Sequence, residues 1–184
     1  MTKLKCFGPF VVLIGLIPSM VCAQSEMYHK SDLDRLGLSY DILAGAQRLY
    51  ERKLESMLSD GLSSAERGLL QQQIELSMFC IVQRDYFSNI SMLGNDSERF
   101  ADQRDLLKID YTVFAGALQR FDLANRADME RQYHESFDVY RDQLRSIYAR
   151  YDADDPVAVQ EISDLTTNCK GKLASIDQLH KAAN

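Results

Sequence analysis

Two cysteines are the residues of this chain whose chemistry the sequence predicts most directly. Cys80 and Cys169 are the only cysteines beyond the first 23 residues. An even pair of cysteines in an oxidising compartment typically forms a disulfide. A reactive thiol or a metal ligand would need polar, electropositive neighbours, whereas Cys80 lies in the apolar run Met78-Phe-Cys-Ile-Val82. We therefore predict a structural disulfide between Cys80 and Cys169.

The compartment is inferred from residues 1–23, which have the pattern of a signal peptide. Two lysines precede the apolar run 10–17, Pro18 breaks that run, and Val21-Cys-Ala23 suits cleavage after Ala23. An uncleaved membrane anchor would need about 20 apolar residues, and this run is shorter and flanked by Gly and Pro. We therefore expect residues 24–184 to form a single helical-bundle domain that is periplasmic or secreted.

The charge of the expected mature chain limits its partners. Without residues 1–23 the chain keeps 19 basic and 27 acidic residues, a net charge of −8. An acidic surface does not favour nucleic acid or an anionic membrane surface. We therefore expect a protein partner, no nucleic acid and no stable membrane anchor after cleavage.

Motifs of catalysis are missing from the sequence. It contains no Gly-x-Ser-x-Gly, no His-Glu-x-x-His, no Gly-rich phosphate loop and no Cys-x-x-Cys. A di-iron bundle needs pairs of Glu-x-x-His, and the nearest pattern, Glu130 with His134, has a spacing of four and stands alone. We interpret His134 as a solvated helix residue and predict no catalytic residue, no metal site and no cofactor.

One helical segment carries a periodic row of aromatic residues, which we call the aromatic stripe. Its members follow each other at spacings of three or four and are Tyr133, Phe137, Tyr140, Leu144, Tyr148 and Tyr151. Arginines flank the row, and both Tyr and Arg are favoured at protein interfaces. The other interpretation is an ordinary core face with hydroxyl groups at its rim. The candidate partner-binding residues are Tyr133, Phe137, Tyr140, Arg141, Arg145, Tyr148 and Tyr151.

Two further possibilities concern the interior and the oligomeric state. A small helical enzyme or carrier could bind an anionic metabolite through Gln83, Arg84 and Arg104, because buried arginines need carboxylate or ligand partners. This function requires a pocket of a few hundred Å³. Alternatively, the aromatic stripe could be the seam of a homodimer.

The elements that position these residues are predicted to be helices throughout. Between Pro18 and Pro156 the sequence is rich in helix formers and shows no sustained alternation of apolar and polar residues. Caps and breaks predict an all-α, up-and-down bundle of four to five long antiparallel helices. The expected helices are 31–59, 63–93, 96–125, 127–151 and 156–180. Residues 24–30 and those after His180 are expected to fray.

Two sequence features bear on how these helices pack. In an up-and-down order Cys80 and Cys169 meet at the same height of the bundle. In addition, Tyr40-Asp-Ile-Leu-Ala-Gly-Ala46 recurs at an offset of 71 residues as Tyr111-Thr-Val-Phe-Ala-Gly-Ala117. The match is either the trace of a duplicated helical hairpin or a coincidence. In both cases the small residues predict a close approach of helices.

These observations together favour a binding protein. We expect an exported, non-enzymatic helical bundle that binds another protein in the periplasm or extracellular space, as an inhibitor, immunity factor or adaptor does. Binding of an anionic metabolite within the bundle is the alternative.

Overall fold

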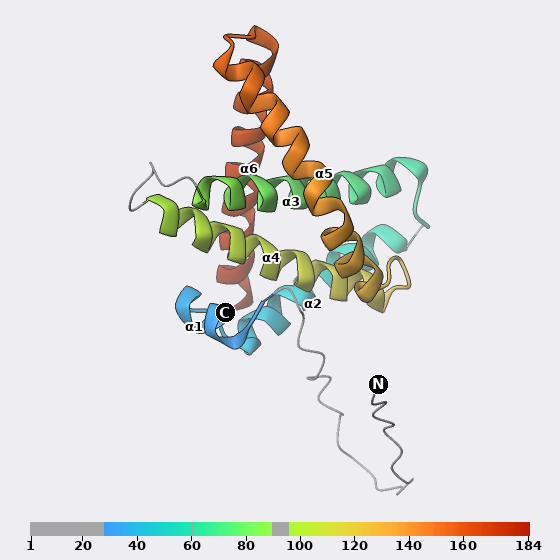
Figure 1. Cartoon of the computed structure of the whole chain (residues 1–184). Helices are drawn as coiled ribbons and strands as arrows, with labels where there is room; N and C mark the ends of the chain where they lie inside the picture. Colours follow the sequence, from blue (N-terminus) through green and yellow to red (C-terminus); the bar gives the residue numbers. More distant parts are fainter. Residues whose placement is uncertain (1–27, 60, 90–95) are drawn as a thin grey trace, which may run out of the picture.

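The computed structural model describes residues 28–59, 61–89 and 96–184, and within these ranges the chain is helical with no strand (Figure 1). The all-α class is therefore confirmed. The predicted signal peptide lies outside the described residues. The six helices are α1 (Lys30–Leu36), α2 (Tyr40–Leu58), α3 (Ser64–Ser88), α4 (Asp96–Arg120), α5 (Arg126–Asp152) and α6 (Pro156–Ala183).

The first expected helix is divided in two. Gly37 adopts a left-handed conformation with φ 66° and ends α1, and Ser39 then caps α2 by accepting a hydrogen bond from the Ile42 N–H at 3.2 Å. Glycine adopts this conformation at little cost, so it ends a helix efficiently. The predicted continuous helix over 31–59 is therefore wrong, because Gly37 ends α1 within this range.

The other predicted helix starts that fall on described residues are confirmed. Ser63 forms a capping box with Glu66, and Asn125 caps α5 through the N–H groups of Ala127 and Asp128. Asp155 caps α6, in which proline occupies the first turn, the position that proline tolerates best. The break expected between helices 96–125 and 127–151 is therefore present. The expected end of the second helix near Leu93 lies outside the described residues, and α3 ends at Ser88.

The helices are not all aligned along one axis. In Figure 1, α3 and α4 lie side by side, and α5 and α6 run across them and converge at the turn 153–155. The up-and-down antiparallel order is therefore not confirmed. The described residues form six helices instead of the expected four to five, because α1 is a separate short helix. Similar helix lengths and short turns identify neighbours, but the crossing angle depends on how side-chain ridges fit together.

The predicted disulfide lies in the interior between α3 and α6. The Cys80 and Cys169 sulfurs are bonded, their Cα atoms are 5.3 Å apart, and both residues are fully buried. Apolar side chains from α2 to α6 surround the bond and form the main core, which includes Leu54, Met78, Ile81, Leu107, Tyr111, Leu118, Met129, Tyr133 and Ile176. The disulfide thus ties α6 to the layer formed by α3 and α4.

The two segments of the sequence repeat lie on α2 and α4, which pack against each other. A Cβ atom at Gly116 would lie 3.2 Å from the Gln47 side-chain oxygen, and one at Gly45 would lie 2.7 Å from the Ala183 backbone oxygen. The predicted close approaches are therefore present. Because α6 continues to Ala183 and packs on α2, the helix extends beyond the end expected at His180.

Candidate functional site

The inner half of the aromatic stripe faces the protein interior. Tyr133 and Leu144 are buried, while Phe137 and Tyr140 are half-buried. The Tyr140 ring meets the Phe79 ring of α3 edge to face, with centroids 4.5 Å apart. This half of the stripe therefore attaches α5 to the body of the protein, in line with the core interpretation.

The outer half of the stripe leads toward the surface. The Tyr148 ring stacks on the Tyr86 ring of α3 at a centroid distance of 5.2 Å, and burial raises the pKa of Tyr148 to about 12. The next member, Tyr151, is 45% exposed. Of the tyrosines proposed as partner-binding residues, Tyr151 is therefore the one that is open to a partner.

The two arginines of the candidate interface pair with acidic residues of α5 itself, and Arg141 is half-buried. Arg141 pairs with Asp138 at 2.7 Å and Arg145 pairs with Asp142 at 3.5 Å, both within one helical turn. Exposed pairs of this kind contribute little to stability, about 0–1 kcal/mol each. Arg145 is exposed, so its guanidinium can exchange this partner for another at little cost.

The turn between α5 and α6 projects beyond the layer of α3 and α4 (Figure 1). Tyr151, Val157 and Val159 are 45%, 57% and 46% exposed in this region. Asp152 and Asp154 are exposed beside them and form no ion pair within the described part of the chain. We call residues 151–159 the hairpin tip. It combines apolar surface with unpaired negative charge.

A salt-bridge network spans the two helices of the hairpin tip. Arg150, in the last turn of α5, pairs with Asp155 at 3.4 Å and with Glu161 of α6. These contacts join the two helices on either side of the turn. Arg150 and Glu161 are 41% and 40% exposed, so these contacts link α5 to α6 with only a small gain in stability.

Sequence reasoning did not identify Val157 and Val159 as surface residues. The available signal was the run Val157-Ala-Val159, because consecutive residues of a helix point about 100° apart and cannot all face one core. In the structure the middle residue, Ala158, is the buried one.

The residues of the alternative ligand site are separated into two environments. Gln83 and Arg84 are buried, Gln83 donates a hydrogen bond to Thr166 at 3.4 Å, and the Arg84 guanidinium lies 5.4 Å from the centre of the Phe100 ring. Burial lowers the pKa of Arg84. No carboxylate among the described residues pairs with Arg84.

Arg104 belongs to a charge network of its own. It donates hydrogen bonds to Asp105 at 2.8 Å and to Asp85 at 3.1 Å, and Arg35 of α1 contacts Asp105 at 2.5 Å and also pairs with Asp102. Burial alone would raise the pKa of Asp105, but the hydrogen bond and charge of Arg104, together with Arg35, hold it below its usual range. This network attaches α1 and α3 to α4.

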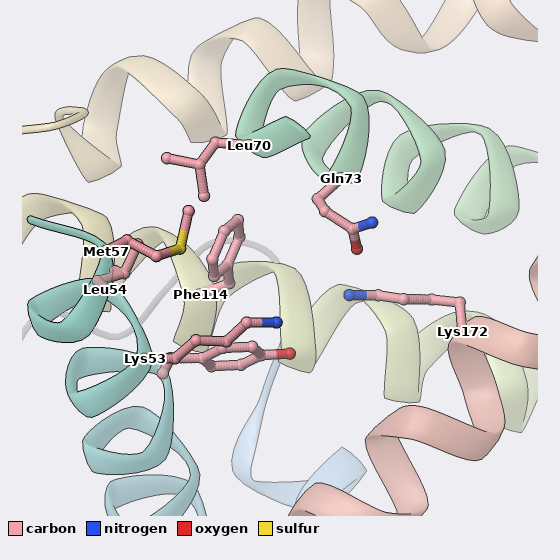
Figure 2. Close-up of a pocket in the computed structure, with 8 residues that line it drawn as sticks. Lys53, Leu54, Met57, Leu70, Gln73, Phe114 and Lys172 are labelled. Carbon is pink, nitrogen blue, oxygen red and sulfur yellow. The ribbon is translucent and has the colours of Figure 1, made fainter. Parts of the chain in front are cut away.

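A cavity lies elsewhere, among α2, α3, α4 and α6 (Figure 2). Its volume is about 60 Å³, well below the size of a typical metabolite pocket. Neither Arg84, Arg104 nor Gln83 lines it. The lining residues are Tyr50, Lys53, Leu54, Met57, Leu70, Gln73, Phe114 and Lys172.

Two polar residues of the cavity wall, Tyr50 and Lys172, contact the buried carboxylate of Asp110. The Tyr50 hydroxyl donates a hydrogen bond to one Asp110 oxygen at 2.7 Å, and the Lys172 ammonium lies 2.9 Å from the other. Burial, followed by the charge of Asp110 and this hydrogen bond, raises the pKa of Tyr50 far above its usual value. Tyr50 therefore stays protonated and acts as a donor.

Two further observations concern the part of the chain that the structure describes. It contains no group of three or more His, Cys, Asp or Glu side chains placed to hold a metal ion. None of its helices has a stretch that is both long and apolar enough to span a membrane.

Comparison with known proteins finds no matching family model, no matching curated protein and no matching solved structure.

Proposed function

We propose that this protein is exported and acts without catalysis by binding another protein, as an inhibitor, immunity factor or adaptor does, and that the hairpin tip is its contact surface. The observation that carries the proposal is the exposure of Tyr151 and Val157 beside the unpaired Asp152 and Asp154. Exposed apolar side chains that lie together are a feature of interaction sites.

The exposed apolar residues are concentrated at this point of the molecule. Six large apolar residues of the described chain are strongly exposed, and three of them lie within the nine residues 151–159. Scattered single residues of this kind need no explanation. Their occurrence at one projecting turn supports a contact role, and tyrosine is among the residues that dominate interface energies. Val157 and Val159 point about 200° apart on α6, so they belong to different faces of the tip.

The charge of the tip supports a partner with a basic surface. Asp152 and Asp154 lie beside the apolar residues, and the expected mature chain is acidic as a whole. Opposite charges on two proteins steer their encounter and fix their orientation. The inner stripe residues Tyr133, Phe137 and Tyr140 then serve to hold the hairpin on the body, and Arg145 with Tyr148 borders the contact.

The proposal is tested by capture from an envelope extract. The mature protein is immobilised beside a Tyr151→Ser/Val157→Ser variant and a Leu69→Ser control, because Leu69 is 55% exposed but lies on α3. We expect wild type and control to retain the same basic protein and the tip variant to lose most of it. Equal retention by all three, or no specific protein on any of them, contradicts the proposal.

The electrostatic part has a separate test. Asp152→Asn/Asp154→Asn removes two charges, and asparagine tolerates the positive φ of 59° at position 154. We expect weaker capture and a smaller loss of binding when salt is raised. Unchanged salt dependence would contradict the basic-partner assignment.

A further inference from the structure

We propose that the cavity among α2, α3, α4 and α6 binds a small free carboxylic acid as its anion, with the carboxylate held by Lys53 and Lys172 and a short alkyl chain lying against the apolar wall. This site is separate from the hairpin tip and does not depend on the proposed partner. The sequence also suggested an anionic ligand within the bundle, bound by Gln83, Arg84 and Arg104. The ligand proposed for the cavity is of the same class but has a different set of binding residues.

The cavity has one polar side and one apolar side. In Figure 2 the polar ends of Lys53, Gln73 and Lys172 converge on the open space from three different helices. Apolar side chains form the opposite wall, namely Leu54, Met57, Leu70 and Phe114. A ligand that matches both sides has one charged end and a short hydrocarbon end.

The charge balance selects an anion. Asp110 is 1% exposed and lies behind the cavity, where it compensates Lys172, whose side chain is 8% exposed. Its two oxygens are occupied by Tyr50 and Lys172. Lys53 has no ion pair within the described ranges. The two lysines and Asp110 together therefore leave one positive charge, which suits a monoanion.

The available donors suit a carboxylate. Each ammonium group carries three N–H donors, and the Gln73 amide carries two more. Lys172 directs its ammonium to Asp110 and keeps other N–H groups for a ligand. A carboxylate can accept all of these, whereas an amine would be repelled by both lysines.

Size and access restrict the ligand further. A volume of about 60 Å³ holds only a few heavy atoms, which excludes long chains and fused rings. Lys53 and Gln73 are exposed at the rim, so a small molecule enters without unfolding of the helices. A phosphate ion would fit the charge but would gain nothing from Phe114 and Leu70.

The test is a titration of the mature, disulfide-bonded chain with sodium butyrate, followed by NMR shifts of the Met57 methyl group and by calorimetry. Acetate, n-butylamine and inorganic phosphate are the comparison probes. We expect saturable binding of butyrate, weaker binding of acetate, and no shift of Met57 with the amine or phosphate. Absence of saturable binding at millimolar butyrate, or equal binding of phosphate, overturns the proposal.

Variants locate the site. Lys53→Gln removes an exposed ammonium and should fold, and we expect it to weaken butyrate binding about tenfold, the effect of losing one charge-assisted hydrogen bond. Lys170→Gln is the matched control, because Lys170 is exposed on α6 and does not line the cavity. If Lys53→Gln binds butyrate as tightly as wild type, or if Lys53→Gln and Lys170→Gln lose the same affinity for butyrate, the assignment of the site to this cavity is overturned.

Discussion

Lys172 of α6 places its ammonium nitrogen 2.9 Å from the Asp110 carboxylate of α4, and the two side chains are 8% and 1% exposed. Together with the Tyr50 hydroxyl of α2, which donates to the same carboxylate at 2.7 Å, the pair connects three helices around one buried charge. Such a pair offsets its own desolvation only while both partners are present. The pair therefore holds α2, α4 and α6 together, and we call Asp110 and Lys172, with Tyr50, the buried lock.

Removal of one partner of this lock is expected to be costly. Asp110→Ala leaves the Lys172 ammonium buried without its carboxylate, so we expect the free energy of unfolding to fall by about 3–5 kcal/mol. Urea denaturation followed by circular dichroism measures it. The double variant Asp110→Leu/Lys172→Met removes both charges and should lose much less. If the single variant loses under about 1 kcal/mol, the pair is not a lock.

Loss of the disulfide should destabilise the fold through the unfolded chain. The Cys80→Ala/Cys169→Ala variant removes a cross-link between residues separated by 89 positions, and the chain-entropy model gives a loss of about 4.6 kcal/mol. The midpoint of urea unfolding reports this loss. Added reductant should lower the midpoint of wild type and leave the double variant unchanged. A midpoint of wild type that does not respond to complete reduction would refute the assignment.

Replacing a helical glycine by alanine is expected to lower the stability of the protein at position 45 and to raise it at position 171. Gly45→Ala places a methyl group 2.7 Å from the Ala183 backbone oxygen, so we expect a loss of about 1–3 kcal/mol. Gly171→Ala in α6 meets nothing within 4 Å and should add about 0.5–1 kcal/mol. Thermal or urea unfolding compares the two variants.

The Gly45 effect has an internal control. Deletion of Ala183 and Asn184 removes the atoms that the new methyl group would meet, so the deletion should rescue most of the Gly45→Ala loss. If the loss persists in the shortened chain, the contact between α2 and the end of α6 is not its cause.

The charge network around Asp105 predicts a loss of stability in acid. Arg104 and Arg35 hold the pKa of this carboxyl below its usual range against the effect of burial. The contribution is therefore fully present above the unfolded pKa of about 3.9 and is lost as pH falls through the lower folded pKa. We expect Asp105→Asn to flatten the dependence of unfolding free energy on pH as the pH falls below about 4. An unchanged slope would show that Asp105 does not contribute.

The sequence was sufficient for the features that depend on local chemistry. The caps at Ser63 and Asp155 were predicted because a short polar side chain serves the free N–H groups of a first turn in any context. The pairing of Cys80 with Cys169 was predictable because these are the only two cysteines outside the expected signal peptide, residues 1–23.

Features that depend on how helices meet were not predictable. The crossing of α6 over α3 results from the fit of many side chains, which no single spacing encodes. For the same reason the sequence could not show that Tyr133 faces the core while Tyr151 faces solvent, since both belong to one periodic stripe. The cavity combines side chains from four helices, so its residues are scattered in the sequence.

The central claim is that the hairpin tip contacts a partner protein, and site-specific photocrosslinking in cells that produce the protein tests it most directly. A photoreactive residue is placed at position 151, at position 157, and at the equally accessible position 69 of α3. The account predicts a covalent adduct with a basic protein from positions 151 and 157 and none from position 69. Adducts from position 69 alone, or no adduct from either tip position, would contradict it.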